Sequence, residues 1–231
     1  MKGGISFMSK RTKLAERKLP NYTKGEEIMN MVTHIVGGGF AILILISCVI
    51  RAAIHHSAWG VVSSVVYGVC MIVLYTMSSV YHGLRPNTGK KVMQVIDHCT
   101  IYFLIAGTYT PIVLCAFRPA YPVLGWSIFA LEWGVTALAV TLTAIDLKMY
   151  KVFSMICYIV LGWVIIPFAG KVIETTTFAG FIFILSGGIA YTIGSVLYGI
   201  GKKTRWMHSV FHIFVVLGSL LQFIAIFFYV L

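Results

Sequence analysis

Long apolar stretches constrain this chain more than any other feature of its sequence. Seven of them occur, near residues 29–51, 60–82, 93–115, 122–145, 150–170, 178–200 and 207–230. Each has roughly the 20 residues that an α-helix needs to cross a bilayer. The connections are short, and the mean hydropathy of +0.91 lies far above that of a soluble domain. The sequence therefore predicts an all-α integral membrane protein, folded as a bundle of seven transmembrane helices.

A basic, polar tail, residues 1–28, precedes the first apolar stretch. We expect this tail to lie in the cytoplasm and residues 29–231 to form a single transmembrane domain. The first stretch begins late and is long enough to span the membrane, which predicts that it is retained rather than cleaved as a signal peptide.

The cysteines all fall within predicted spans and show no CxxC pairing. This pattern argues against a disulfide framework or a thiolate zinc site. We interpret them as small packing residues. They are Cys48, Cys70, Cys99, Cys115 and Cys157.

Basic residues predict the orientation of the chain. Of the 18 Lys and Arg residues, all but Arg51, Arg118 and Lys171 fall in the tail or in the second, fourth and sixth connections. Because loops rich in Lys and Arg stay in the cytoplasm, we expect a cytoplasmic N-terminus and an external C-terminus. The basic residues of the tail and of these cytoplasmic connections also account for the net charge of +11. It predicts membrane lipids as partners and no nucleic acid, and it leaves the oligomeric state open.

Two histidines, His208 and His212, open the last apolar stretch in "KKTRWMHSVFHIF". Four positions apart on a helix, they lie one above the other on the same face, as two ligands of one metal would. Ionisable groups inside a bilayer usually line a cavity, pair with one another or bind an ion. The spacing alone is equally compatible with hydrogen bonds to neighbouring helices, so a metal site requires a third ligand at the same depth.

The predicted topology supplies that ligand and a carboxylate. His82 ends the second stretch on the cytoplasmic side, and Asp97 lies on the third stretch about 9 Å beyond Lys91. Three neutral imidazoles are a known zinc set that leaves a position for water, and a nearby carboxylate can act as a base. We therefore predict a Zn²⁺ site at His82, His208 and His212, with Asp97 as the catalytic base.

Three further polar residues lie near this depth. Ser78 precedes His82 by four residues and faces the same way, so it could orient the water or a substrate carbonyl, or else bond back to a helix carbonyl. His98 points about 100° away from Asp97 around the helix, which favours a hydrogen bond over metal ligation. His34 is on the correct side for an indirect supporting role.

Five further ionisable residues are not assigned to the metal site. Glu132, in the middle of the fourth stretch, should be protonated or hydrogen-bonded between helices, and a proton relay is the alternative. His55 and His56 fall in the first external loop, where solvent should surround them. Asp146 and Glu174 fall at helix ends, which favours surface positions.

Two prolines and two groups of small residues predict local shape. Pro111 and Pro167 should kink the third and fifth helices. Small residues at 37–39 and in "SGGIAYTIGS" should let neighbouring helices approach closely.

Motifs from six of the stretches, taken in order, resemble one family. They are "EEIMNMVTHIVGG", "SSVYHGL", "IDHCTIYFLIAGTYTP", "GWVIIP", "SGGIAYTIGSVLY" and "HSVFHIFVVLGS". The chain resembles, over nearly its whole length, the bacterial hemolysin III-like proteins, which are related to the progestin and adiponectin receptors and more distantly to alkaline ceramidases.

This resemblance implies a seven-helix fold with an intramembrane zinc at His82, His208 and His212. It also matches Asp97 to the family's aspartate near the zinc-bound water, and Ser78 to the family's serine four residues before the histidine of the second helix. One departure is Gln222, where bacterial members often carry a histidine. That position lies far toward the outer leaflet, so the zinc set is unaffected.

Function follows less directly from the resemblance. The receptors and ceramidases point to hydrolysis of lipid amides, whereas the bacterial name refers to cell lysis, and a role in membrane-lipid homeostasis is also implied. We favour a zinc-dependent lipid amide or ester hydrolase. The alternatives are a sensor or receptor with structural zinc, a pore-forming cytolysin, and a channel or transporter that uses Glu132.

Overall fold

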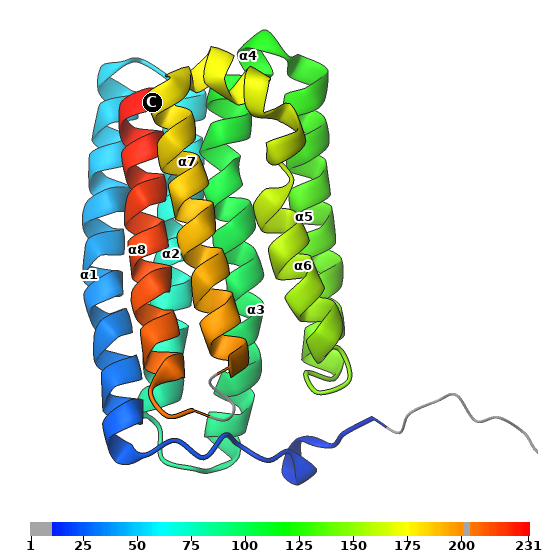
Figure 1. Cartoon of the computed structure of the whole chain (residues 1–231). Coiled ribbons are helices and arrows are strands. Elements are labelled where there is room, and N and C mark those ends of the chain that lie inside the picture. Colours follow the sequence, from blue (N-terminus) through cyan, green and yellow to red (C-terminus); the bar gives the residue numbers. More distant parts are fainter. Residues whose placement is uncertain (1–10, 201–203) are drawn as a thin grey trace, which may run out of the picture.

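Every regular element in the described part of the chain is a helix. The computed structural model describes residues 11–200 and 204–231 (Figure 1). Six helical stretches are long and apolar enough to cross a membrane: Lys24–Ile54, Ala58–Gly83, Thr88–Ala120, Pro122–Ile145, Lys151–Gly199 and Met207–Tyr229. The all-helical membrane architecture is therefore confirmed.

The predicted spans 150–170 and 178–200 both fall in the stretch Lys151–Gly199, which accounts for a count of six instead of seven. This stretch contains α6 (Lys151–Trp163), the 3₁₀ turn η3 (Ile166–Phe168) and α7 (Ala169–Ile200). Within α7 the backbone of Thr177 is non-helical, with φ 70° and ψ 166°. In Figure 1, α6 rises to the end of the bundle where the C-terminus lies, and α7 returns from that end.

The other helices begin close to the predicted positions because polar side chains cap their free N–H groups. In α1 (Lys24–Ile54), Thr23 and Glu26 form a capping box. Ser57 caps α2 (Ala58–Gly83), and Asn87 caps α3 (Thr88–Pro111). The remaining elements are η1 (Leu14–Glu16), the π-helical turn η2 (Ile112–Phe117), α4 (Arg118–Ala120), α5 (Pro122–Ile145) and α8 (Met207–Tyr229).

Both prolines interrupt regular helix, as predicted. Pro111 ends α3, and the chain continues as the π-helical turn η2. Pro167 lies within η3, between α6 and α7. A proline lacks the backbone N–H that a continuing α-helix would need, so the hydrogen-bonding pattern changes at both positions.

The helices face lipid with apolar side chains and pack against one another through small residues. Leu43 and Val196 are 63% and 57% exposed, as expected for residues that contact hydrocarbon. A Cβ on Gly37 would lie 2.8 Å from the ring of Tyr75, so α1 and α2 could not approach as closely with a larger residue. The predicted role of the small residues at 37–39 is confirmed at Gly37. The cysteines are all free.

Asp146 is buried, which corrects the expectation of a surface position. Its carboxylate accepts hydrogen bonds from the backbone N–H of Thr12, at 2.6 Å, and from those of Lys148 and Met149. Burial by itself raises the pKa of Asp146, but these N–H groups outweigh burial and hold the pKa below its usual range. Spacing along the sequence could not reveal this role, because Thr12 is 134 positions away.

Part of the basic tail follows the end of the bundle at which α1 begins (Figure 1). The Arg11 Nε donates to the carbonyl of Ile145, and the Lys91 Nζ donates to the carbonyl of Ala15. The tail therefore contacts both the α5–α6 connection and the start of α3.

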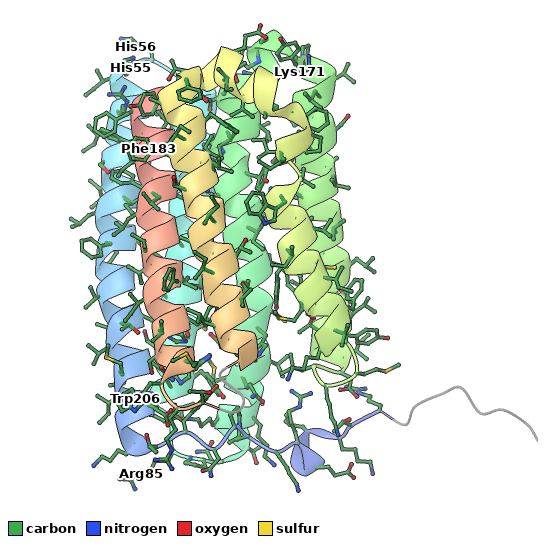
Figure 2. The ribbon with its side chains drawn as sticks, in the orientation of Figure 1. His55, His56, Arg85, Lys171, Phe183 and Trp206 are labelled. Atoms are coloured by element: carbon green, nitrogen blue, oxygen red, sulfur yellow. The ribbon has the colours of Figure 1, made fainter. Side chains whose placement is uncertain are left out.

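Figure 2 shows Arg85 and Trp206 at one end of the bundle, and Lys171, His55 and His56 at the other. This arrangement separates the two groups of connections on which the predicted orientation depends. Four of the basic residues used in that argument, Lys2, Lys10, Lys202 and Lys203, lie outside the described residues.

Candidate metal centre

Three histidines meet at the end of the bundle where α1 begins. His82 lies in the last turn of α2, and His208 and His212 lie in the first two turns of α8. The Nε2 of His208 is 3.3 Å from the Nε2 of His82 and 3.1 Å from the Nε2 of His212. One nitrogen from each ring lies within 4.8 Å of the others, which is the geometry of a group that could hold a metal ion.

The first turn of α1 helps to position α8. Glu26, which closes the capping box with Thr23, also accepts a hydrogen bond from the backbone N–H of Trp206 at 2.8 Å. Trp206 adopts a left-handed conformation, with φ 67°, immediately before α8 begins. The chain therefore enters α8 beside the start of α1, which places His208 next to the end of α2.

Hydrogen bonds orient two of the three rings. The Nδ1 of His82 donates to the Glu27 carboxylate at 2.7 Å, and the Nδ1 of His212 donates to the carbonyl of Asn30 at 3.1 Å. A neutral imidazole has a single N–H, so the Nε2 of each of these rings carries a lone pair. Both lone pairs are directed toward His208, in the arrangement that supporting residues usually impose on metal-binding histidines.

Residues from α1 surround the histidines. Glu27 also accepts from the Nζ of Lys90 at 2.6 Å, and the Asn30 side chain accepts from the hydroxyl of Ser209 at 2.6 Å. Glu27 and Asn30 are not among the site residues predicted from the sequence. A signal was present, because Glu27, Asn30 and His34 recur at helical spacing on one face of an otherwise apolar helix.

Two rings stack on the histidines. His34 lies 3.7 Å from His212 between ring centroids, with 13° between the planes, which agrees with the supporting position expected for it. Tyr22 stacks on His208 at 5.0 Å and 14°. Burial raises the pKa of Tyr22, so its phenol stays neutral against the imidazole.

Asp97 and Ser78 share a cavity with His208 and His212. The Asp97 carboxylate lies outside the three-histidine group, and one of its oxygens is 3.8 Å from the Nδ1 of His98. His98 instead donates to the carbonyl of Gln94, which agrees with the expectation that it forms a hydrogen bond. The structure thus brings the predicted base to the same cavity as two of the predicted ligands.

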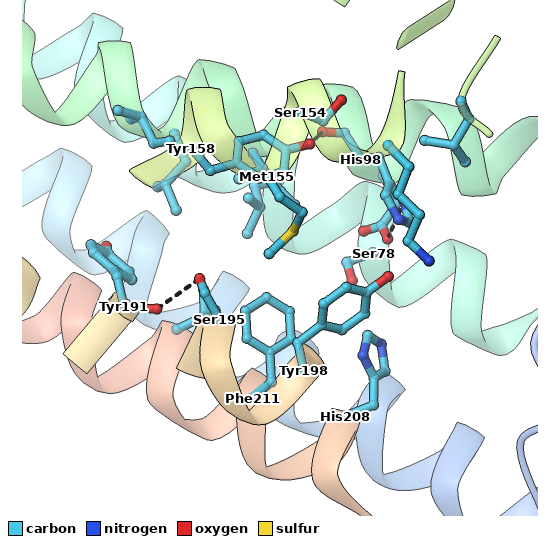
Figure 3. Close-up of a pocket in the computed structure, with 18 of the residues that line it drawn as sticks. Ser78, His98, Ser154, Met155, Tyr158, Tyr191, Ser195, Tyr198, His208 and Phe211 are labelled. Atoms are coloured by element: carbon cyan, nitrogen blue, oxygen red, sulfur yellow. Dashed lines mark hydrogen bonds and ion pairs between the residues drawn. The ribbon is translucent and has the colours of Figure 1, made fainter. Parts of the chain in front are cut away.

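Ser78 is buried at the cavity wall, close to the histidines in Figure 3. Its hydroxyl forms no hydrogen bond with any residue that the structure describes, so the expected alternative of a bond to a helix carbonyl is not observed. Tyr198 lines the same wall, with its ring centroid 5.4 Å from that of His208. Tyr198 is not among the site residues predicted from the sequence.

The cavity has a volume of about 600 Å³ and extends from the histidines to Gln222 on α8. By helical rise, Gln222 lies roughly 21 Å along the helix axis from His208. Most of the wall between them is apolar, and it includes Leu104, Ile105 and Ile159. A long apolar chamber therefore runs from the histidines into the membrane interior.

Comparison with known proteins assigns this architecture to a family. The family model for haemolysin-III related proteins matches residues 22–223. The chain belongs to the haemolysin-III related family. It is 36% identical to hemolysin-3 of Bacillus cereus, over 89% of this chain and 92% of that protein. It is 35% identical to the hemolysin-3 homolog of Bacillus subtilis (strain 168), over 90% of this chain and 96% of that protein.

Similarity extends to a human protein, the monocyte to macrophage differentiation factor. The identity is 25%, over 95% of this chain and 90% of the human protein. Together with the six apolar helical stretches, membership of the haemolysin-III related family makes this chain a multi-pass protein of the cell membrane.

In this haemolysin-III related protein, Gln222 stands apart from the histidine centre, as the resemblance implied. Its Nε2 donates to the carbonyl of Ile184 at 3.0 Å, and its Oε1 is buried without a partner in the described chain. A Cβ on Gly187 would lie 2.7 Å from that Nε2, so α7 and α8 approach closely here.

Other ionisable residues lie away from the centre. Glu132 on α5 is fully buried, and neither carboxylate oxygen has a hydrogen-bond partner among the described residues. His55 and His56 are exposed at the opposite end of the bundle, and Glu174 is exposed, as predicted.

Proposed function

We propose that this protein binds zinc through His82, His208 and His212 and hydrolyses an amide or ester bond of a membrane lipid. The convergence of three Nε2 atoms at one end of an apolar cavity carries the proposal. We further propose that the chain takes part in membrane-lipid homeostasis.

The spacing of the nitrogens fits zinc. Tetrahedral coordination with Zn–N distances of 2.0–2.1 Å separates ligand nitrogens by about 3.3 Å, and the measured separations are 3.3 and 3.1 Å. Hydrogen bonding among the rings is a weaker account. His208 could donate one Nε2 proton to one neighbour, which would leave the other close pair of nitrogens unsatisfied.

We propose that the chain crosses the membrane seven times, with α6 and α7 as separate spans and the N-terminus in the cytoplasm. The opposite directions of α6 and α7 and the break at Thr177 support separate spans. In intact cells, an impermeant thiol reagent should label a cysteine introduced at His56 but not one introduced at Arg85. The reverse pattern would refute the orientation.

The chain's own residues suit hydrolysis of a lipid bond. Zinc, when bound, would supply a water made acidic enough to react near neutral pH. The Asp97 carboxylate would accept the proton, since it lines the same cavity as His208 and His212. The Ser78 hydroxyl, which has no partner among the described residues, would donate to the scissile carbonyl. The cavity volume is in the usual range for ligand sites, and its apolar wall would hold the acyl chain.

The test begins with lipid analysis of membranes from cells with and without the protein, followed by incubation of purified protein with any lipid that the protein depletes. Asp97→Asn should reduce turnover of that lipid by about 10²–10⁴-fold, because it removes the base. Zinc content and the thermal midpoint in detergent should be unchanged. Ser154→Ala, a change in another residue that lines the cavity, serves as a control that should retain turnover.

Undiminished turnover in Asp97→Asn, with zinc retained, would refute the base assignment. Failure of the wild-type protein to deplete any lipid would refute the hydrolase.

A sensor or receptor with structural zinc is the second candidate. One observation favours it: the centre joins α2 and α8 directly and α1 through Glu27 and Asn30. A metal there would hold three helices together. In that case His82→Ala should lower the thermal midpoint, and no hydrolysis would be detected in the wild-type protein.

A further inference from the structure

Arg17 is a buried cation at the end of the cavity near the histidines, and no acidic residue that the structure describes forms an ion pair with it. It is 8% exposed, and its Nε and Nη1 atoms are buried without a hydrogen-bond partner in the described chain. Its side chain lines the same cavity as Asp97, His208 and His212. Buried guanidinium donors without a partner are unfavourable, so this side chain is suited to bind an anion that enters the cavity.

The neighbouring acidic residues do not supply that partner. Glu26 binds the backbone N–H of Trp206, and Glu27 binds His82 and Lys90. Asp146 already accepts from the backbone N–H groups of Thr12, Lys148 and Met149. Asp97 lines the cavity, yet no ion pair joins it to Arg17 within the described residues.

The cavity end around Arg17 carries net positive charge. Four basic side chains line it, and only two acidic ones, Glu16 and Asp97, do so. The basic residues are Arg17, Lys18, Lys148 and Lys151. Beyond this end, the wall becomes apolar toward Gln222. A cavity with cations at one end and an apolar body matches an amphiphile with an anionic headgroup.

The segment that carries Arg17 is held in place independently of any ligand. Asp146 accepts from the N–H of Thr12, and Lys91 donates to the carbonyl of Ala15. On the other side of Arg17, Tyr22 stacks on His208. The residues before and after Arg17 in the sequence are therefore held by contacts with the bundle, and these contacts keep Arg17 at the cavity end.

We propose that Arg17 binds the phosphate or carboxylate headgroup of a single acidic lipid whose alkyl chain occupies the cavity. This inference rests on the proposed function, because it names the class of lipid that the hydrolase would accept. The guanidinium presents a planar fork of donors that matches two oxygens of either group.

The experiment measures binding to the full chain in detergent by native mass spectrometry. The probes are hexadecyl phosphate, the uncharged hexadecyl glycerol ether, and inorganic phosphate. The wild-type protein should prefer hexadecyl phosphate to the uncharged ether by about tenfold or more. Arg17→Gln should reduce this preference to nearly none.

Lys13→Gln is the matched control. It removes one positive charge from the same segment, but Lys13 is exposed and does not line the cavity. It should retain the preference. Arg17→Lys keeps the charge and should retain part of the preference, which separates loss of the headgroup contact from misfolding.

Three results would overturn the inference. They are a wild-type protein with no preference for the anionic probe, a preference that survives in Arg17→Gln, and inorganic phosphate that displaces hexadecyl phosphate at equal concentration. The last result would identify a free anion as the ligand.

Failure of the hydrolase would be distinguishable, because binding is measured without turnover. Arg17-dependent binding without cleavage of any lipid would refute only the hydrolase. Cleavage of lipids without an Arg17-dependent preference would refute only this inference.

Discussion

The histidine centre and Glu132 are two buried ionisable sites in the same bundle, and they are built in opposite ways. At the centre, Glu27 and the Asn30 carbonyl orient His82 and His212, and the three Nε2 atoms converge. Glu132 is equally buried, but neither of its oxygens has a partner among the described residues. In the first site, three side chains direct a nitrogen toward one another. The second site is a single side chain between packed helices.

This contrast between the two sites shows how polar residues in an apolar sequence can be interpreted. A functional site in a membrane needs supporting residues that fix the protonation and direction of each ring. An isolated acid can be accommodated as a neutral group, because burying a protonated carboxyl costs far less than burying a charged one. Burial alone is therefore weak evidence of function, and convergence with supporting hydrogen bonds is stronger evidence.

Removal of one converging ring should have the largest effect. His208→Ala should reduce the zinc content of the purified protein from about one ion per chain to almost none, because the central nitrogen is lost. Metal analysis by mass spectrometry measures this directly. His98→Ala is the matched control, since His98 is a histidine of the same cavity outside the group. Equal zinc in both variants would show that the centre does not hold the metal.

Removal of a supporting acid should have an intermediate effect. Glu27→Gln should weaken zinc binding by about 10–100-fold, because the amide orients and polarises the His82 ring less strongly than the carboxylate. Competition with a chelator gives the affinity. Glu174→Gln makes the same change at an exposed position and should leave affinity unaltered. Unchanged affinity in Glu27→Gln would mean that α1 contributes only packing to the centre.

Neutralisation of Glu132 should have the smallest effect. Because burial without a partner favours the neutral acid, Glu132→Gln should change the unfolding free energy by less than about 1 kcal/mol and leave zinc content unchanged. The thermal midpoint in detergent and metal analysis test both statements. A large loss of stability, or loss of proton flux that the wild-type protein shows in liposomes, would instead give Glu132 an ionised or transport role.

Much of the site could be predicted from the sequence because the alternation of basic residues assigns a depth to every intramembrane residue. His82 and Asp97 were matched to His208 and His212 in this way. The supporting residues were harder to identify, since Glu27 lies at the polar start of its helix and resembles an ordinary capping residue. The expected surface position of Asp146 is wrong for a similar reason: an acid at a helix end usually faces solvent, and its sequence position does not show that the tail covers it.

The sequence alone is enough to predict a helical membrane bundle, because apolar runs of this length can satisfy their backbone hydrogen bonds in lipid only as helices. It also determined which histidines share a depth. Three features become visible in the folded chain alone: the Nε2 atoms meet, Asn30 and Glu27 orient two of the rings, and Arg17 of the tail is buried at the cavity end. These features depend on contacts between residues as far as 182 positions apart, which no local spacing encodes.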